Sequence, residues 1–203
     1  MNWSMRLFIS TGSPFARKCR IVAREKGLID RVEEVPMIFP YKDGDEFLAA
    51  SPMGQVPALI AEDGQPMTDS PLICAYLDSL GDSPRLLPKD GPDHWRVRRL
   101  ETLADCIQEM AVKVAMESRR PDGERSPTWI GYWNEGLNRA LDQAEARAPD
   151  TDTLDLGSIG LAVAGHYVDF RRPEFGWRTT RPRLAALADA LDRRPSFAQT
   201  RPT

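Results

Sequence analysis

Two Ser-Pro pairs stand where helices are expected to begin, and they are the residues best suited to chemistry. Ser13 precedes Pro14, while Asp69 and Ser70 precede Pro71. Serine is a favoured N-cap and proline is favoured in the first helical turn, so each pair predicts a helix N-terminus. A helix N-terminus offers unpaired N–H groups and the positive end of the helix dipole. The chemistry that these residues favour is therefore the binding of an anionic group.

The first eighty residues predict an α/β unit that positions these pairs. Residues 6–10 and 32–37 predict two strands, and residues 14–26 predict a helix between them that ends at Gly27. A strand, a helix and a strand within about thirty residues indicate a βαβ unit with parallel strands.

A hairpin and a second helix complete this unit. After an irregular or helical piece at residues 40–50, Val56-Pro57 leads into strands at residues 58–61 and 66–68, which are joined by an Asp-Gly turn. The helix that follows begins at Ser70 and has apolar residues at helical spacing.

The rest of the chain predicts an all-α domain. Apolar residues recur at helical spacing in four segments: residues 100–114, 130–144, 159–165 and 184–191. We therefore expect a thioredoxin-like domain over residues 5–80, a proline-rich linker over residues 81–92 and an α-helical domain over residues 93–203. The segment 159–165 is apolar all round, which is typical of a central helix.

Composition excludes several classes of protein. Lys and Arg number 27 against 30 Asp and Glu, giving a net charge of −3, so a general nucleic-acid or anionic-membrane binder is not expected. No apolar run reaches the roughly 18 residues of a membrane span, and no export signal is visible. Three scattered cysteines and two histidines make a disulfide framework or a metal site improbable. We expect a reduced, cytoplasmic protein without a bound metal.

The common catalytic motifs are absent or incomplete. The sequence has no Gly-x-Gly-x-x-Gly after a strand and no Walker A loop. Residues 156–160 resemble a nucleophile elbow but lack its first glycine. Cys19 and Cys74 fall inside predicted helices, where core packing is the expected role.

Three segments in this order resemble the cytosolic glutathione S-transferase superfamily: Ser13-Pro14-Phe15-Ala16-Arg17-Lys18, Gly54-Gln55-Val56-Pro57-Ala58-Leu59 and Asp69-Ser70-Pro71. The resemblance covers nearly the whole chain, including Arg194-Pro195-Ser196-Phe197. It is nearest to the serine-type branches, in particular to short bacterial glutathione S-transferase-like proteins with an N-terminal Ser-Pro-Phe motif. It implies an α/β N-terminal domain of thioredoxin-like type (βαβαββα) followed by an α-helical C-terminal domain.

The resemblance also implies roles for the residues that would surround glutathione, a tripeptide with a central cysteine. The Ser13 hydroxyl would stabilise the glutathione thiolate, with Ser10 as the weaker candidate. Arg17 would add a positive field there, unless it is a solvated surface arginine. Val56 would pair with the cysteinyl residue through a cis peptide bond to Pro57.

The remaining implied contacts concern the two ends of glutathione and the second substrate. Asp69 and Ser70 would bind the γ-glutamyl group, and Gln55 and Phe15 would complete the glutathione site. Met110 and Val114, on the first long C-terminal helix, are candidates for the wall of an electrophile pocket.

The central helix departs from the family pattern. That helix often opens with Ser or Thr and has Asp three residues later, whereas here Asp155 and Ser158 occupy the two positions in reverse. An Asp N-cap still accepts backbone N–H bonds, so we expect the helix to form.

The function implied is that of a homodimeric glutathione transferase. It would use glutathione as co-substrate, conjugate it to a small hydrophobic electrophile and serve in detoxification. The alternative is a non-catalytic protein that binds glutathione or a partner on the same fold. Glutathione-dependent reduction or isomerisation ranks lower, because the reductase branch has a cysteine at the Ser13 position.

Overall fold

The computed structural model describes residues 4–38, 44–81 and 84–203. The chain divides into two compact units, of which the first comprises residues 1–87 and 194–203 and the second residues 88–193. The last residues therefore group with the first unit, although the sequence suggested the α-helical domain for them. The boundaries expected from sequence stay a prediction.

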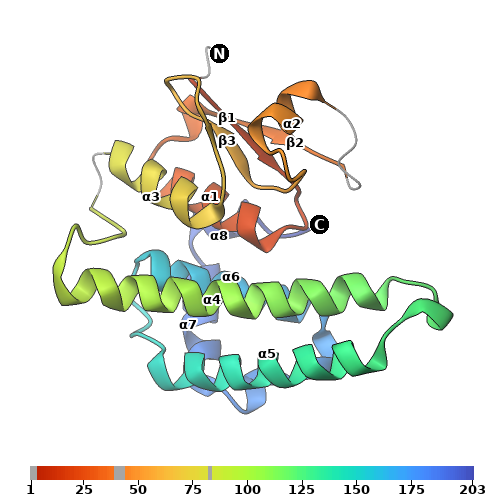
Figure 1. Cartoon of the computed structure of the whole chain (residues 1–203). Helices are drawn as coiled ribbons and strands as arrows, with labels where there is room; N and C mark the ends of the chain where they lie inside the picture. The colour runs from red at the N-terminus through yellow and green to blue at the C-terminus, as the bar shows by residue number, and fades with distance from the viewer. Residues whose placement is uncertain (1–3, 39–43, 82–83) are drawn as a thin grey trace. The chain divides into compact units, whose positions relative to one another are not determined.

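The first unit is built on a four-stranded sheet with the order β2-β1-β3-β4 (Figure 1). The strands are β1 (Met5–Ile9), β2 (Val32–Pro36), β3 (Ala58–Ile60) and β4 (Pro66–Met67). β1 and β2 are parallel, whereas β3 pairs antiparallel with both β1 and β4. The expected βαβ unit and hairpin are both confirmed.

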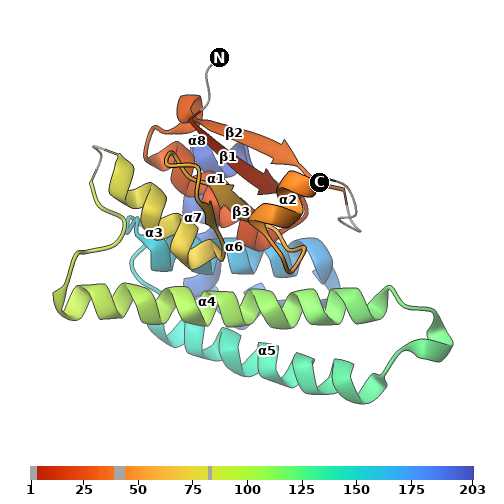
Figure 2. The ribbon, with the colours of Figure 1, turned by 45° about the horizontal axis from the view of Figure 1, so that its top comes forward.

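Helices cover both faces of this sheet. α1 (Pro14–Glu25) and α3 (Ser70–Leu80) pack against each other on one side, as Figure 2 shows. Because side chains alternate along a strand, Phe8 points to the opposite side from its neighbours. There it contacts Phe47 of α2 (Asp45–Ala50), with 5.5 Å between the ring centroids. Of the piece expected at residues 40–50, residues 45–50 are helical, and residues 40–43 lie outside the described part.

The second unit consists of α4 (Gly91–Ser118), α5 (Pro127–Arg147), α6 (Leu156–Arg171) and α7 (Pro182–Asp192), together with three short 3₁₀ turns. α6 is buried along most of its length and packs on α4, as the apolar segment predicted. Gly157 permits this approach, because a Cβ atom there would lie 2.7 Å from Leu100 Cβ.

Asp155 and Ser158 form a reciprocal cap at the start of α6. Asp155 Oδ1 accepts from Ser158 N at 2.8 Å, and Ser158 Oγ accepts from Asp155 N at 2.9 Å. This is the capping-box geometry with the two residue types exchanged, and it satisfies two backbone donors.

The structure adds elements that the sequence did not indicate. A short helix, α8 (Pro195–Ala198), belongs to the first unit, and α4 begins inside the segment expected to be a linker. Among the helices of residues 4–38, 44–81 and 84–203, none has both the length and the apolar character needed to cross a bilayer.

Candidate functional site

The C-terminal end of β1 brings the three sequence segments together. In the antiparallel register Phe8 pairs with Ala58, and Leu59 pairs with Met67. The start of β3 and the end of β4 therefore lie at the edge where β1 ends and the chain turns into α1. Because Pro57 precedes β3, Asp69 follows β4 and Ser13 begins α1, the sheet places all three at this edge.

Ser13 caps α1 and keeps one donor available. Its backbone is extended, with φ −89° and ψ 124°, and its Oγ accepts from Ala16 N at 3.3 Å. Its carbonyl accepts from Arg17 N at 3.0 Å, and its N–H donates to Ser10 O at 3.0 Å. A hydroxyl that accepts in this way still has its hydrogen to donate. The side chain is half-buried, so a ligand can reach it at the positive end of the helix.

Arg17 lies one turn along α1 from Ser13 and is buried rather than solvated. Its side chain is 3% exposed, Nη2 donates to Phe197 O at 3.2 Å, and the guanidinium lies 5.7 Å from the centroid of the Phe197 ring. Of the two alternatives for Arg17, the solvated surface arginine is therefore wrong. The Arg17 guanidinium is directed to Phe197 of the C-terminal segment, which belongs to the same unit.

The Val56–Pro57 peptide bond is cis, as the resemblance implied. Ser51, which is fully buried, holds the loop before it: its Oγ donates to Gln55 O at 2.8 Å and accepts from Gln55 N at 3.1 Å. The Gln55 side chain is exposed, and Val56 packs against the cluster around Phe8. The loop is thus held through its backbone, with the Gln55 side chain facing outward and the Val56 side chain packed inward.

Asp69 and Ser70 open α3 with contrasting side chains. Asp69 is exposed, caps the helix and accepts from Ser70 N at 2.5 Å, and its peptide bond to Thr68 is also cis. The Ser70 hydroxyl is fully buried and has no hydrogen-bond partner in the described part of the chain. Leaving such a group unpaired costs about 1–3 kcal/mol, which a polar group of a ligand would offset.

The arrangement at this edge has counterparts among known proteins. Residues 12–80 match the family model described as "Glutathione S-transferase, N-terminal domain". The chain is 36% identical to the uncharacterized GST-like protein YibF of Escherichia coli, and the match covers 98% of each protein. The chain belongs to the glutathione S-transferase family.

Solved structures of the family share the whole fold. The chain is 32% identical to a glutathione transferase family member from Pseudomonas fluorescens with bound glutathione, at a TM-score of 0.90 over 98% of this chain and 99% of that one. The chain is also 31% identical to a glutathione S-transferase from Methylobacillus flagellatus with glutathione bound. The TM-score is 0.89 over 98% of this chain and 100% of that one. A curated maleylacetoacetate isomerase of Pseudomonas aeruginosa is 28% identical over 98% and 96% of the two chains. These likenesses confirm the fold class expected from the sequence.

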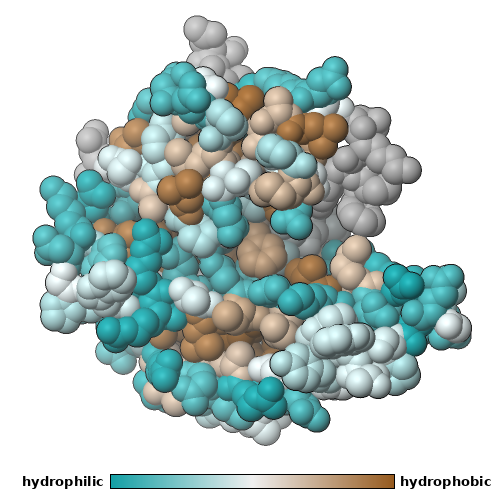
Figure 3. All heavy atoms as spheres, viewed as in Figure 1, coloured by the Kyte–Doolittle hydropathy of each residue, from teal (hydrophilic) through white to brown (hydrophobic). Residues whose placement is uncertain are grey.

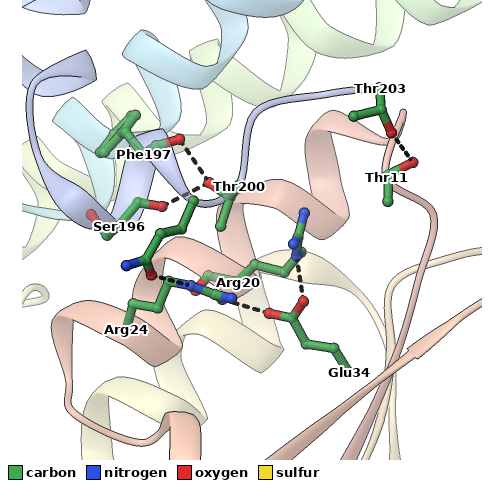
Figure 4. Close-up of polar contacts among 9 residues, drawn as sticks. Thr11, Arg20, Arg24, Glu34, Ser196, Phe197, Thr200 and Thr203 are labelled. Carbon is green, nitrogen blue, oxygen red and sulfur yellow. Dashed lines mark hydrogen bonds and ion pairs between the residues drawn. The ribbon is translucent and has the colours of Figure 1, made fainter.

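Two features near the candidate site were not predicted from the sequence. The first is Ser51, whose clamp on Gln55 leaves no trace in hydrophobic periodicity. The second is the C-terminal segment, where Thr203 Oγ1 donates to Thr11 Oγ1 at 2.8 Å, two residues before Ser13 (Figure 4). The sequence signal in this C-terminal segment was the family resemblance at Arg194-Pro195-Ser196-Phe197.

The structure gives positions for the remaining predicted residues, and their roles stay predictions. Phe15 is half-buried in the first turn of α1. Met110 and Val114 lie four residues apart on one face of α4 in the second unit, where Val114 is buried. Met110 Sδ lies 3.6 Å from the position that a Cβ atom at Gly136 of α5 would take. Their part in an electrophile pocket stays a prediction.

Proposed function

We propose that this protein is a serine-type glutathione transferase in which Ser13 holds the glutathione sulfur as a thiolate. The observation that carries the proposal is the Ser13 hydroxyl, which caps α1 and still has a hydrogen to donate. The glutathione-bound relatives at 31–32% identity support the choice of ligand.

The interactions expected at this position are of the size that the proposal requires. A cysteine thiol has a pKa of about 8.5, and lowering it by about two units requires roughly 2.7 kcal/mol in favour of the anion. A hydrogen bond to a charged acceptor contributes about 1.5–3 kcal/mol, and the helix dipole adds about 0.3–1 kcal/mol. The combined range of the hydroxyl and the helix includes the required amount.

The rest of the tripeptide would be held by backbone and helix ends. The Val56 backbone would pair with the cysteinyl residue in the manner of an added strand. The carboxylate of the γ-glutamyl group would accept from the buried Ser70 hydroxyl at the start of α3, and Asp69 would bind its amino group. Gln55 and Phe15 would complete the site.

The reaction would be a conjugation that depends mainly on holding the glutathione thiolate close to the electrophile. The thiolate attacks the electrophilic carbon of a small hydrophobic substrate, a sulfur–carbon bond forms, and the displaced pair of electrons goes to the leaving group or an adjacent atom. Met110 and Val114 are the proposed wall of that pocket. A Pseudomonas fluorescens relative with bound S-(propanoic acid)-glutathione, a glutathione thioether, supports this outcome.

The thiolate is measured directly by its ultraviolet absorbance. Glutathione bound to the wild-type protein should titrate about two pH units below free glutathione, and in Ser13→Ala the titration should move back towards about 8.5. Ser10→Ala is the matched control, since it removes a neighbouring hydroxyl from the same loop. Identical titration curves for wild type and Ser13→Ala would rule out Ser13.

A second candidate is glutathione binding without catalysis. Calorimetric titration with glutathione, alongside assays with several electrophiles, separates the two. Binding with turnover supports the transferase, whereas binding without turnover supports the non-catalytic protein.

A further inference from the structure

Two buried thiols meet where α1 packs on α3. Cys19 Sγ and Cys74 Sγ lie 3.8 Å apart, and both side chains are fully buried. The residues are separated by 55 positions in the chain, and the proposed conjugation uses neither thiol. The third cysteine, Cys106, is exposed on α4 of the second unit.

The two sulfur atoms need little movement to bond. A disulfide has a sulfur–sulfur distance of about 2.05 Å, so the atoms must approach by slightly less than 2 Å. Rotation of the two side chains with a small shift of the helices supplies such a movement. Because both thiols are buried, the oxidant must be small and neutral, and α3 must open locally to admit it.

We propose that Cys19 and Cys74 form a reversible disulfide that cross-links α1 to α3. The oxidant is a peroxide. One thiolate attacks a peroxide oxygen, the O–O bond breaks, and a sulfenic acid and water form. The other thiolate then attacks the sulfenic sulfur and releases a second water, so two thiols and one hydrogen peroxide give one disulfide and two waters.

The cross-link reaches the glutathione site, provided that the proposed function holds. The Cys19 thiol donates to Ser70 O with 3.9 Å between sulfur and oxygen, and Ser13 caps the same helix that carries Cys19. Oxidation removes this thiol hydrogen and draws the sulfur away from the first turn of α3. The lost bond lies within the protein and acts on glutathione through the position of Ser70, so the oxidised protein binds glutathione more weakly.

Peptide mapping tests the bond itself. The full chain carrying Cys106→Ala is treated with hydrogen peroxide, alkylated and digested without reductant. The expected product is one cross-linked peptide pair containing Cys19 and Cys74, which a dithiol reductant separates. Recovery of both residues only as alkylated thiols or as separate sulfinic acids would overturn the proposal.

Thermal unfolding gives a second readout. A disulfide that closes a loop of this length should raise the melting temperature of the Cys106→Ala protein by about 5 °C or more. Cys19→Ala and Cys74→Ala, each made separately and checked for folding by circular dichroism, should show no such rise on oxidation. A rise of equal size in either variant would contradict the assignment.

Binding of S-methylglutathione, which cannot reduce a disulfide, tests the coupling to the site. Titration of the reduced and oxidised Cys106→Ala protein should give a weaker affinity for the oxidised form. Equal affinities would overturn the coupling. If neither form binds while the cross-link is mapped, the proposed function fails and the disulfide stands.

Discussion

Ser70 shows how an uncompensated group in the folded protein points to a ligand. Its hydroxyl is buried and unpartnered in the described part of the chain, whereas its backbone N–H donates to Asp69, the N-cap of the same helix. Such a position is maintained at a cost in stability. If glutathione supplies the missing partner, the Ser70 hydroxyl lowers the stability of the free protein but strengthens the binding of glutathione.

Ser70→Ala should change stability and glutathione affinity in different ways. Since the substitution removes an unsatisfied hydroxyl, the free energy of unfolding without ligand should stay unchanged or rise by up to about 1 kcal/mol. Glutathione affinity should fall by about tenfold, because one hydrogen bond to a charged group is lost. Urea unfolding and calorimetric titration measure the two effects.

Ser51→Ala is the matched control for this pair of measurements. The Ser51 hydroxyl has two partners, so its loss should lower the free energy of unfolding by about 1–2 kcal/mol. A similar loss of stability in Ser70→Ala would show that the Ser70 hydroxyl is satisfied within the protein.

Local signals decided how well each element could be predicted. Ser13 marked the start of α1 correctly because capping is a property of adjacent residues, and the Asp-Gly turn marked the hairpin. The start of α3 was also placed correctly, although its N-cap is Asp69 and Ser70 is its first helical residue. α8 was missed, because four residues carry no periodicity and the partner, α1, is far away in the sequence. Around the candidate site, the helix start at Ser13 follows from local sequence, whereas the hydrogen bonds of Ser51 to Gln55 and the burial of Arg17 depend on tertiary contacts.

The junction of α1 and α8 should respond to pH. Burial opposes the charged form of Glu25, but hydrogen bonds from Arg194 and Ser196 outweigh it and hold the pKa of Glu25 below its ordinary value. A carboxylate whose pKa is lowered on folding stabilises the protein above its unfolded pKa, and this stabilisation is lost as pH falls through the folded pKa.

Glu25→Gln should therefore cost more stability at neutral pH than in acid. The difference in free energy of unfolding between wild type and variant should be largest near pH 7 and should shrink below about pH 4. Urea unfolding across this range measures it. A difference that does not change with pH would contradict the role given to the charged form of Glu25.

At the scale of the whole molecule, the resemblance implies a homodimer. Large apolar side chains are exposed in both units, among them Leu72 at 53% and Trp129 at 54%. Apolar side chains also reach the surface between α4 and α5 (Figure 3). Exposed apolar surface of this kind is commonly covered by a protein partner.

Light scattering at micromolar concentration should accordingly give the mass of two chains. Dimers of this kind are more apolar at their interfaces than weakly associating proteins, so the mass should persist in high salt. A mass of one chain under these conditions would contradict the proposal.

The return of residues 194–203 to the first unit has a consequence for biosynthesis. Their anchors, Glu25 and Arg17 on α1, leave the ribosome early, whereas Arg194 and Phe197 emerge only after all of the second unit has been translated. The unit that starts first is therefore finished last. In a nascent chain stalled just before residue 194, Glu25 of α1 lacks its ion pair with Arg194. The first unit of that intermediate should therefore be more sensitive to protease than the first unit of the full chain.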